Sequence, residues 1–173
     1  MSYIVSVLTP TYNREKELHN LYKSLKSQTN KEFEWVIVDD GSSDNTEEVV
    51  KGWIEEKTLD IKYIKQENGG KHTAVNTGVA QISSPLTFIV DSDDILTADA
   101  IDSIIGDSAE VVNNDKLCGI GYLRGFSETD VIGDKFSINR AIGNFNVERY
   151  KRNIKGDKAE VWKTSDMKAL PFP

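Results

Sequence analysis

Short apolar runs alternate with amphipathic stretches along the first two thirds of the chain. The runs are rich in β-branched residues and predict buried strands at 4–8, 33–38, 61–64 and 86–90. Apolar residues at helical spacing predict helices with buried faces over 18–25, 49–54, 74–82 and 101–112. Strands that alternate with helices in this way predict an α/β fold of the Rossmann-like type. We expect a mostly parallel central sheet with helices on both faces.

The last third of the chain has a less regular pattern. Two further strands are predicted at Cys118–Leu123 and Ala159–Trp162, and the polar, glycine-containing residues between them predict no regular element. A length of 173 residues is typical of one domain with a substantial core. We therefore interpret residues 1–173 as a single domain.

Four local features can be predicted from residue type and position. Asn13 is a candidate cap for the first helix, and Asp44 with Glu47 fits a capping box for the second. His19 lies off the apolar stripe of its helix and is expected in solvent. Cys118 falls in an apolar run and is expected to be a small buried residue rather than a nucleophile.

Composition excludes several classes of function. The 28 acidic and 21 basic residues give a net charge of −7, which argues against a broad basic face and a nucleic-acid partner. One Cys and two His exclude an internal disulfide and a Cys/His zinc cluster. No apolar run approaches the roughly 18 residues of a membrane span, and the N-terminal run lacks a basic flank. A cytoplasmic protein is expected.

Chemically active residues follow the predicted strands. The four strands lead into Thr9–Arg14, Asp39-Asp40, Gly69–His72 and Asp91–Asp94, respectively. In an open parallel sheet, ligands bind beyond the carboxyl ends of the strands. The sequence therefore predicts one site that contains an aromatic loop, two acidic clusters and a Gly-Gly-Lys corner.

The second acidic cluster favours a metal ion. Asp91, Asp93 and Asp94 would repel one another unless a cation gathers them, and oxygen ligands suit Mg²⁺ or Mn²⁺. An EF-hand is excluded because Ile95 and Leu96 occupy positions that need an oxygen ligand and a glycine. A divalent cation at this strand end is the expectation.

Other interpretations of these segments stay open. Asp39-Asp40 alone suits a helix cap or turn as well as a functional site. Lys71 and His72 suit a solvated loop as well as a phosphate-facing corner. A magnesium-binding receiver domain is a rival α/β fold, although it needs one acceptor Asp and a strand-end Lys in place of two clusters. A non-catalytic nucleotide-sugar-binding module is a second alternative.

In order and spacing, the motifs resemble the family 2 glycosyltransferases of the GT-A fold. The resemblance covers about residues 4–112 and rests on five segments: Val5–Arg14, Val36–Thr46, Glu67–Lys71, Ala74–Gly78 and Phe88–Asp94. Beyond these, Gly156–Glu160 is similar to a family segment near the acceptor side. The resemblance implies that residues 1–112 form the nucleotide-sugar-binding half and that residues 113–173 begin the acceptor half.

The same resemblance assigns roles at the donor site. Asp40 matches the carboxylate that contacts the base, commonly uracil, and Lys71 matches a basic residue near the phosphate. The element Asp91-Ser92-Asp93 matches the DxD motif, which contacts ribose and, together with Asp94 in our assignment, holds Mn²⁺ or Mg²⁺. The loop that holds the nucleotide is matched by Pro10, Thr11, Tyr12 and Arg14.

The implied reaction is transfer of a sugar from a nucleotide diphosphate sugar, with UDP favoured, to a hydroxyl with inversion. The expected acceptor is a saccharide or lipid-linked molecule used in cell-surface polysaccharide synthesis, with peripheral association at the inner membrane face. The family's catalytic base is an Asp or Glu beyond the DxD motif, and Asp157 is the candidate. Because the chain ends at Leu170–Pro173, we expect it to be the N-terminal portion of a longer enzyme.

Overall fold

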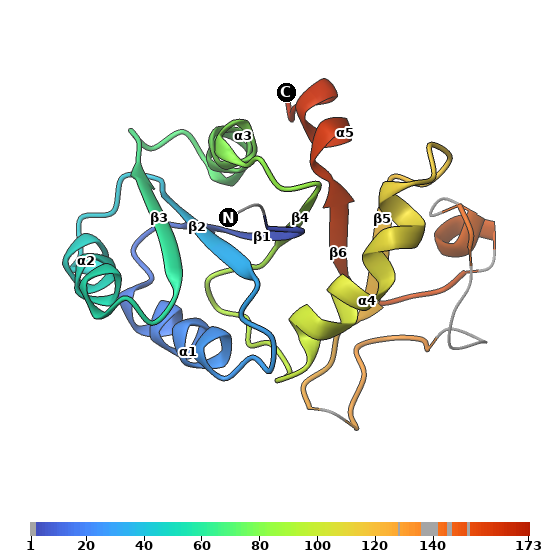
Figure 1. Cartoon of the computed structure of the whole chain (residues 1–173), viewed down its shortest axis with the longest axis horizontal. Helices are drawn as coiled ribbons and strands as arrows, with labels where there is room; N and C mark the ends of the chain where they lie inside the picture. Colours follow the sequence, from blue (N-terminus) through green and yellow to red (C-terminus); the bar gives the residue numbers. More distant parts are fainter. Residues whose placement is uncertain (1–2, 128, 136–141, 145–146, 152) are drawn as a thin grey trace. The chain divides into compact units, whose positions relative to one another are not determined.

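A computed structural model describes residues 3–127, 129–135, 142–144, 147–151 and 153–173 (Figure 1). The chain forms two compact units. The first consists of Met1–Ile120 and Val161–Pro173, and the second of Gly121–Glu160. The expected nucleotide-binding half therefore corresponds to most of the first unit, and a C-terminal segment of the chain returns to complete it.

The central sheet has the strand order β3-β2-β1-β4-β6-β5. Neighbours among the first four of these strands run parallel, and β6 is antiparallel to β4. The strands are β1 (Val5–Thr11), β2 (Phe33–Asp39), β3 (Asp60–Lys65), β4 (Leu86–Ile89), β5 (Gly119–Leu123) and β6 (Lys158–Lys163). The helices are α1 (Glu15–Lys26), α2 (Thr46–Glu56), α3 (Lys71–Gln81), α4 (Ala100–Val112) and α5 (Thr164–Ala169), with a π-helical turn at Val147–Lys151.

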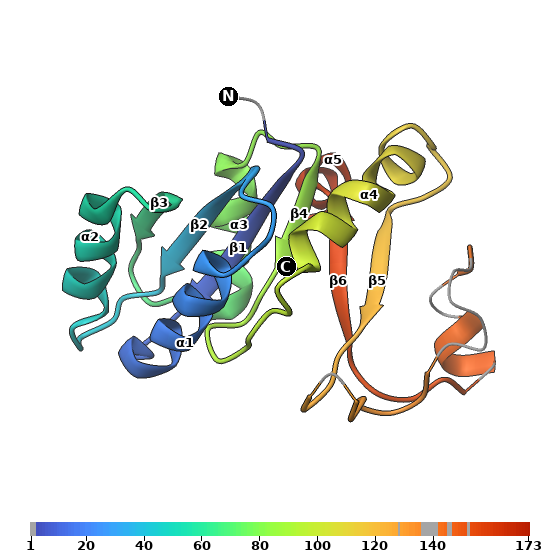
Figure 2. The same ribbon diagram turned by 60° about the horizontal axis from the view of Figure 1, so that its bottom comes forward.

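Helices cover both faces of the sheet in the first unit. Helices α3 and α5 lie on one face, whereas α1 and α2 lie on the other (Figures 1 and 2). This arrangement confirms the predicted α/β fold. It excludes the receiver-like alternative, because a receiver places its third strand beside the first, whereas β4 lies beside β1 in this chain.

Helix α3 packs unusually closely on the sheet. A Cβ atom at Gly78 would lie 2.2 Å from Cδ1 of Leu8 on β1, so any larger residue would force the buried Leu8 side chain to move. Around this contact, Val36, Val38 and Val79 form a fully or almost fully buried cluster. Because the helix is held this tightly, its first residues are fixed at the carboxyl ends of the strands.

Aromatic side chains fill the opposite face of the sheet. Tyr22 stacks on Trp53 with ring centroids 4.2 Å apart, and Trp35 donates a hydrogen bond from Nε1 to Thr9 Oγ1 at 2.9 Å. His19 makes an edge contact with Trp53 at 5.0 Å and is half-buried, so the expectation of a solvated His19 is wrong. The apolar stripe of α1 does not predict this contact, because the large Trp53 ring of α2 also covers a residue beside the stripe.

Three other local predictions are also wrong. Helix α1 begins after Arg14 and α2 after Asn45, neither of which makes a side-chain cap, and Asn13 does not cap α1. Asp44 does accept hydrogen bonds from the first N–H groups of the two helices, Thr46 N at 3.1 Å and Glu15 N at 3.2 Å. The capping box is nevertheless not formed, because Glu47 pairs with Lys51 and Lys65. Cys118 precedes β5 and is exposed rather than buried. In each case a contact or strand boundary set by the tertiary fold overrides the local pattern.

Candidate active site

The carboxyl ends of β1 and β4 mark the point where the strand order reverses. From β1 the chain proceeds outward to β2 and β3, and it then crosses by α3 to β4 on the other side of β1. Main-chain hydrogen bonds fix this edge, from Val90 N to Leu8 O at 2.9 Å and from Asp40 N to Thr11 O at 2.8 Å. Such a switch point is where open α/β sheets bind ligands.

A polar network joins the loop after β1 to the loop after β2. Asp39 accepts a hydrogen bond from Ser42 N at 2.7 Å, and Ser42 Oγ accepts one from Asn13 N at 2.9 Å. Asn13 Oδ1 in turn accepts from Ser43 N at 2.8 Å. Asn13 has a φ of 51°, a left-handed conformation that Asn tolerates better than most residues. The network therefore fixes the turn that carries Tyr12 and Arg14.

Sequence reasoning missed the part played by Asn13 and Asp39 in this network. Asn13 is a helix-cap candidate in the sequence, whereas in the structure it joins the loops after β1 and β2 through Ser42 and Ser43. Asp39 suits a cap or turn as well as a functional site, and in the structure it orders its own loop through Ser42 N. An Asn directly after a strand end, opposite a Gly-Ser-Ser segment in the next loop, is the signal that could have pointed to this role.

Asp40 is buried, and its carboxylate accepts three hydrogen bonds from the segment before α3. Its oxygens accept hydrogen bonds from Gln66 Nε2 at 2.7 Å, Gly69 N at 2.9 Å and Gly70 N at 2.7 Å. Burial acts to raise the pKa of Asp40, but the hydrogen bonds from Gly69, Gln66 and Gly70, with the nearby His72, hold that pKa below its ordinary value. Asp40 therefore stays ionised and shapes the Gly-Gly-Lys corner.

Two acid–base pairs connect the loops at this edge. Lys71 Nζ, at the start of α3, lies 2.5 Å from Asp91 Oδ1, directly after β4. Arg14 Nη1, directly before α1, lies 3.6 Å from Asp93 Oδ2. Each side chain in the two pairs is at least a third exposed. The structure thus brings together four of the residues that the sequence predicted for the donor site.

Thr11 contributes a further polar group at the end of β1. It is 3% exposed, and its Oγ1 is the single buried side-chain oxygen or nitrogen without a hydrogen-bond partner among the described residues. Leaving such a group unpaired costs about 1–3 kcal/mol. Pro10 is buried, Ser92 is 7% exposed and Tyr12 is 48% exposed at the same edge.

The acidic turn after β4 offers oxygen ligands without forming a closed cage. Asp94 N donates a hydrogen bond to Asp91 O at 3.0 Å, which makes a tight turn. Within the described part of the chain, no three His, Cys, Asp or Glu side chains lie together as a metal cluster. The carboxylates of Asp91 and Asp93 suit Mg²⁺ or Mn²⁺ that takes its other ligands from phosphate and water. Metal binding by Asp91, Asp93 and Asp94 stays a prediction.

Asp157 lies in the second unit, where it pairs with Arg124. The Arg124 guanidinium lies within hydrogen-bond distance of Asp157 Oδ2, and the Lys158 N–H donates to Oδ1 at 3.0 Å. Gly156 has a φ of +88°, and a Cβ atom on it would lie 2.3 Å from the carbonyl oxygen of Ile132. A glycine is therefore required before Asp157, whose role as the base stays a prediction.

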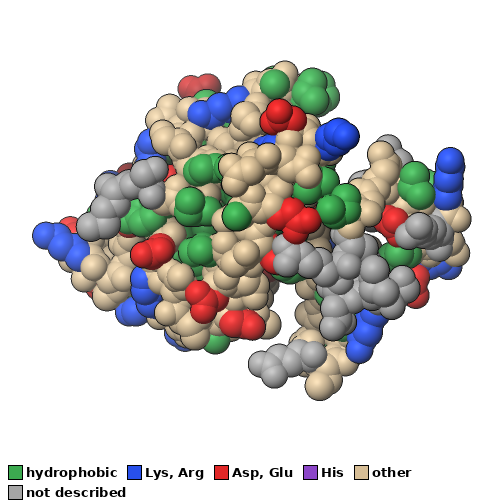
Figure 3. Space-filling view, turned by 45° about the vertical axis from the view of Figure 1, so that its right-hand side comes forward, with side chains coloured by type: hydrophobic (Ala, Val, Ile, Leu, Met, Phe, Trp, Pro, Cys, Tyr) green, Lys and Arg blue, Asp and Glu red, His purple; other side chains and the backbone are tan. Residues whose placement is uncertain are grey.

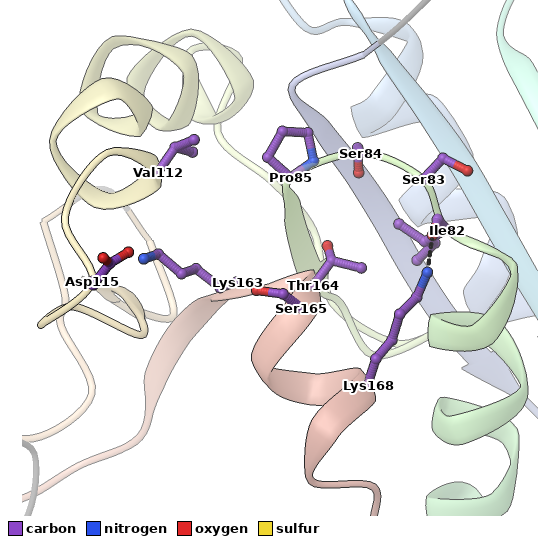
Figure 4. A pocket seen from close by; sticks show the side chains of 10 residues that line it. All are labelled: Ile82, Ser83, Ser84, Pro85, Val112, Asp115, Lys163, Thr164, Ser165 and Lys168. Carbon is purple, nitrogen blue, oxygen red and sulfur yellow. Dashed lines mark hydrogen bonds between the residues drawn. The ribbon is translucent and has the colours of Figure 1, made fainter.

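A cavity of about 400 Å³ lies at the amino end of β4, away from all the predicted donor residues (Figure 4). Lys168 donates a hydrogen bond to the Ile82 carbonyl at 2.7 Å, and Lys163 donates one to the Asn114 carbonyl at 2.8 Å. Pro85 and Thr164 form part of its wall. Both lysines are thus tied to the main chain, and the cavity is distinct from the switch point.

The surface and the helices give two further findings. On the face shown in Figure 3, Lys and Arg side chains are scattered among acidic and apolar ones, and the described residues form no continuous basic surface there. No helix in the described part of the chain has the length and hydropathy needed to cross a bilayer.

Solved structures share the fold of the whole chain. TarS 1–349 of S. aureus in complex with UDP-GlcNAc has a TM-score of 0.76 at 24% identity, covering all of this chain and 49% of that one. The mannosyltransferase PcManGT of Pyrobaculum calidifontis, in complex with GDP-Man and Mn²⁺, has a TM-score of 0.71 at 19% identity and is covered to 48%. These likenesses confirm the predicted GT-A fold.

Curated relatives are similar over most of this chain. Glycosyltransferase GlyG of Streptococcus pneumoniae is 32% identical over 131 residues, which are 75% of this chain and 42% of GlyG. The poly(ribitol-phosphate) β-N-acetylglucosaminyltransferase TarP of Staphylococcus aureus is 33% identical over 119 residues, 66% of this chain and 36% of TarP. The chain thus spans less than half the length of these relatives. Residues 6–152 match the family described as Glycosyl transferase family 2, so the chain belongs to that family.

Proposed function

We propose that the chain binds a nucleoside diphosphate sugar at the carboxyl ends of β1 and β4, and that it serves sugar transfer to a hydroxyl acceptor with inversion. The observation that carries this proposal is the pairing of Lys71 with Asp91 and of Arg14 with Asp93 at the switch point. Two cations and two carboxylates on three loops match the needs of a diphosphate and a divalent cation, respectively.

Each residue has a role in this proposal. Lys71 and Arg14 bind the diphosphate oxygens and stabilise negative charge on the leaving group. Asp91 and Asp93 hold Mn²⁺ or Mg²⁺, which supplies further charge neutralisation when bound. Tyr12 offers an exposed ring for stacking, and the unpaired hydroxyl of buried Thr11 offers a hydrogen bond to the nucleotide.

We propose uridine as the preferred nucleoside and Asp40 as the residue that sets this preference. TarS, which shares the fold, binds UDP-GlcNAc, whereas PcManGT binds GDP-Man. The Asp40 carboxylate has about four acceptor sites, and three of them are used by Gln66, Gly69 and Gly70. The remaining site can accept a hydrogen bond from the base of the nucleotide, and this supports Asp40 as the residue that selects uridine. Competition of UDP against CDP and GDP tests the assignment, and an equal or tighter GDP affinity would contradict it.

We propose a cell-surface polymer or its lipid-linked precursor as the acceptor, because TarP acts on poly(ribitol-phosphate). The base for the acceptor hydroxyl is Asp157 in this proposal, supported by its exposed carboxylate and by the similarity of Gly156–Glu160 to an acceptor-side family segment. The transfer reaction would take place in the cytoplasm.

Calorimetry with UDP and UDP-GlcNAc, in Mn²⁺ and in EDTA, tests the donor site. We expect binding in Mn²⁺ that is at least about tenfold weaker in EDTA. If no nucleoside diphosphate sugar binds under either condition, the proposed function is wrong. A non-catalytic module would bind the donor equally well but transfer no sugar to any acceptor in a radiolabelled-donor assay.

A further inference from the structure

The two acid–base pairs at the switch point occupy the groups that a metal and a diphosphate would need. Lys71 contacts Asp91 at 2.5 Å, and Arg14 contacts Asp93 at 3.6 Å. The four residues come from the loop before α1, the start of α3 and the turn after β4, so no pair is a local contact within one helix. In the ligand-free chain, each carboxylate thus has a cation of the protein as its partner.

Because of these pairs, either ligand binds unfavourably when it binds without the other. A divalent cation that binds Asp91 and Asp93 must displace Lys71 and Arg14, and it leaves two positive side chains beside its own charge. A diphosphate that binds Lys71 and Arg14 leaves two carboxylates facing its phosphates. In both cases like charges come together within a few ångströms, which is unfavourable.

Binding of both ligands together removes this conflict. The carboxylates exchange their protein cations for the metal, while Lys71 and Arg14 exchange the carboxylates for phosphate oxygens. Every charge keeps an opposite partner, and the metal and the diphosphate also bind each other. The exchange therefore favours simultaneous occupation over occupation by either ligand alone.

We propose that Lys71 and Arg14 act as internal counterions that make metal binding by Asp91 and Asp93 conditional on the donor diphosphate. This inference rests on the proposed function, and it adds a mode of regulation to that site. Its consequence is that the free chain binds a divalent cation more weakly than the donor-bound chain does, so that the cation enters together with the nucleotide sugar.

Lys71 provides the sharper test because its substitution leaves the fold intact. Its side chain is 61% exposed, and it begins α3, where a positive charge opposes the helix dipole. Lys51→Met is the matched control. Lys51 is 62% exposed and pairs with Glu47 at 2.7 Å, on α2 rather than at the switch point.

Mn²⁺ binding to the full chain, measured by electron paramagnetic resonance with and without saturating UDP, tests the proposal. Lys71→Met should bind Mn²⁺ alone about two- to fivefold more tightly than the unsubstituted chain, because an exposed ion pair has an effect of that size. Its Mn²⁺ affinity in the presence of UDP should be unchanged or lower, so the enhancement of Mn²⁺ binding by UDP shrinks. Lys51→Met should leave both affinities unchanged.

The outcomes separate this inference from the proposed function. If UDP does not bind in Mn²⁺ at all, both fail. If UDP and Mn²⁺ bind with strong mutual enhancement but Lys71→Met leaves Mn²⁺ binding alone unchanged or weaker, the counterion role is wrong and the donor site stands. Arg14→Met, which frees Asp93 instead of Asp91, should repeat the Lys71→Met result with a smaller change because its pair is longer.

Discussion

The carboxyl edge of the first unit and the segment around Asp157 differ in how their functional side chains are held. At the carboxyl edge, Asp39 and Asp40 are buried. Asp39 accepts a hydrogen bond from Ser42 N of its own loop, which orders the loop that contacts the turn of Tyr12, and Asp40 accepts from Gly69 N and Gly70 N, which fixes the start of α3. Asp157 is 63% exposed and is held by Arg124 and the adjacent main chain. The residues that we propose for the donor are thus preorganised, whereas the carboxylate that we propose as the base has more freedom.

The test of this contrast with the largest expected effect is the replacement of Asp157. Asp157→Asn should lower the rate of sugar transfer by about 10²–10⁴-fold, the usual contribution of a general base, and leave the UDP affinity unchanged. Single-turnover transfer from labelled UDP-GlcNAc, together with calorimetry of UDP, measures both quantities. Asp130→Asn, at an exposed residue of the same unit, serves as the control. A fall in UDP affinity, or an unchanged rate in a chain that transfers sugar, would remove Asp157 as the base.

The second test removes one carboxylate from the first unit. Asp93→Asn should weaken UDP binding in Mn²⁺ by at least about tenfold, because it removes an oxygen ligand of the metal, and it should leave binding in EDTA unchanged or slightly tighter, because it also frees Arg14. Asp115→Asn is the matched control, since Asp115 lines the cavity at the opposite end of β4. An equal loss in Mn²⁺ and in EDTA would mean that Asp93 contacts the nucleotide without a metal.

Sequence reasoning found the strands and the helices but shortened β1. The apolar run 4–8 predicts a strand that ends at Thr9-Pro10, whereas the strand in the structure continues to Thr11. The carbonyl of Leu8 faces β4 and that of Thr11 faces β2, so the nitrogen of Pro10 points to the side of β4, beyond its last residue Ile89. The missing N–H therefore costs no ladder hydrogen bond.

The pairs at the donor site could not be predicted in the same way. The positions of Lys71 and Asp91 at strand ends follow from periodicity, but their contact depends on the order β2-β1-β4, which places the start of α3 beside the end of β4. Likewise, the three hydrogen bonds to Asp40 depend on a loop shape that single residues do not encode. Residue type identified the members of the site, and topology decided their partners.

A third test concerns the packing that fixes α3. Gly78→Ala should destabilise the chain by about 1–3 kcal/mol, because the added methyl group meets Leu8 at 2.2 Å in a packed core. Gly52→Ala in α2 is the matched control, where nothing lies within 4 Å of the added methyl group and the change should stabilise by up to about 1 kcal/mol. Urea unfolding measures both. Equal effects would show that helix propensity alone decides the result.

The smallest expected effect is a pH dependence that originates at the carboxyl edge. Asp40 has a lowered pKa in the folded chain, so its contribution to stability is fully present above the unfolded value of about 4 and is lost as pH falls through the folded value. The slope from one such group stays below about 1.4 kcal/mol per pH unit. Urea unfolding between pH 6 and pH 3 should show a shallower loss for Asp40→Asn than for the unsubstituted chain.

Salt separates this contribution from that of a surface carboxylate. Lys51 and Lys65 lower the pKa of Glu47 to about 2, and because both ion pairs are solvent-exposed, 0.5 M NaCl should suppress the Glu47 part of the pH dependence. The Asp40 part should persist, since its partners are an amide side chain and main-chain N–H groups in a buried position. If salt abolishes the difference between Asp40→Asn and the unsubstituted chain, long-range charge rather than the buried hydrogen bonds lowers the pKa of Asp40. The corner before α3 would then be less preorganised than its contacts indicate.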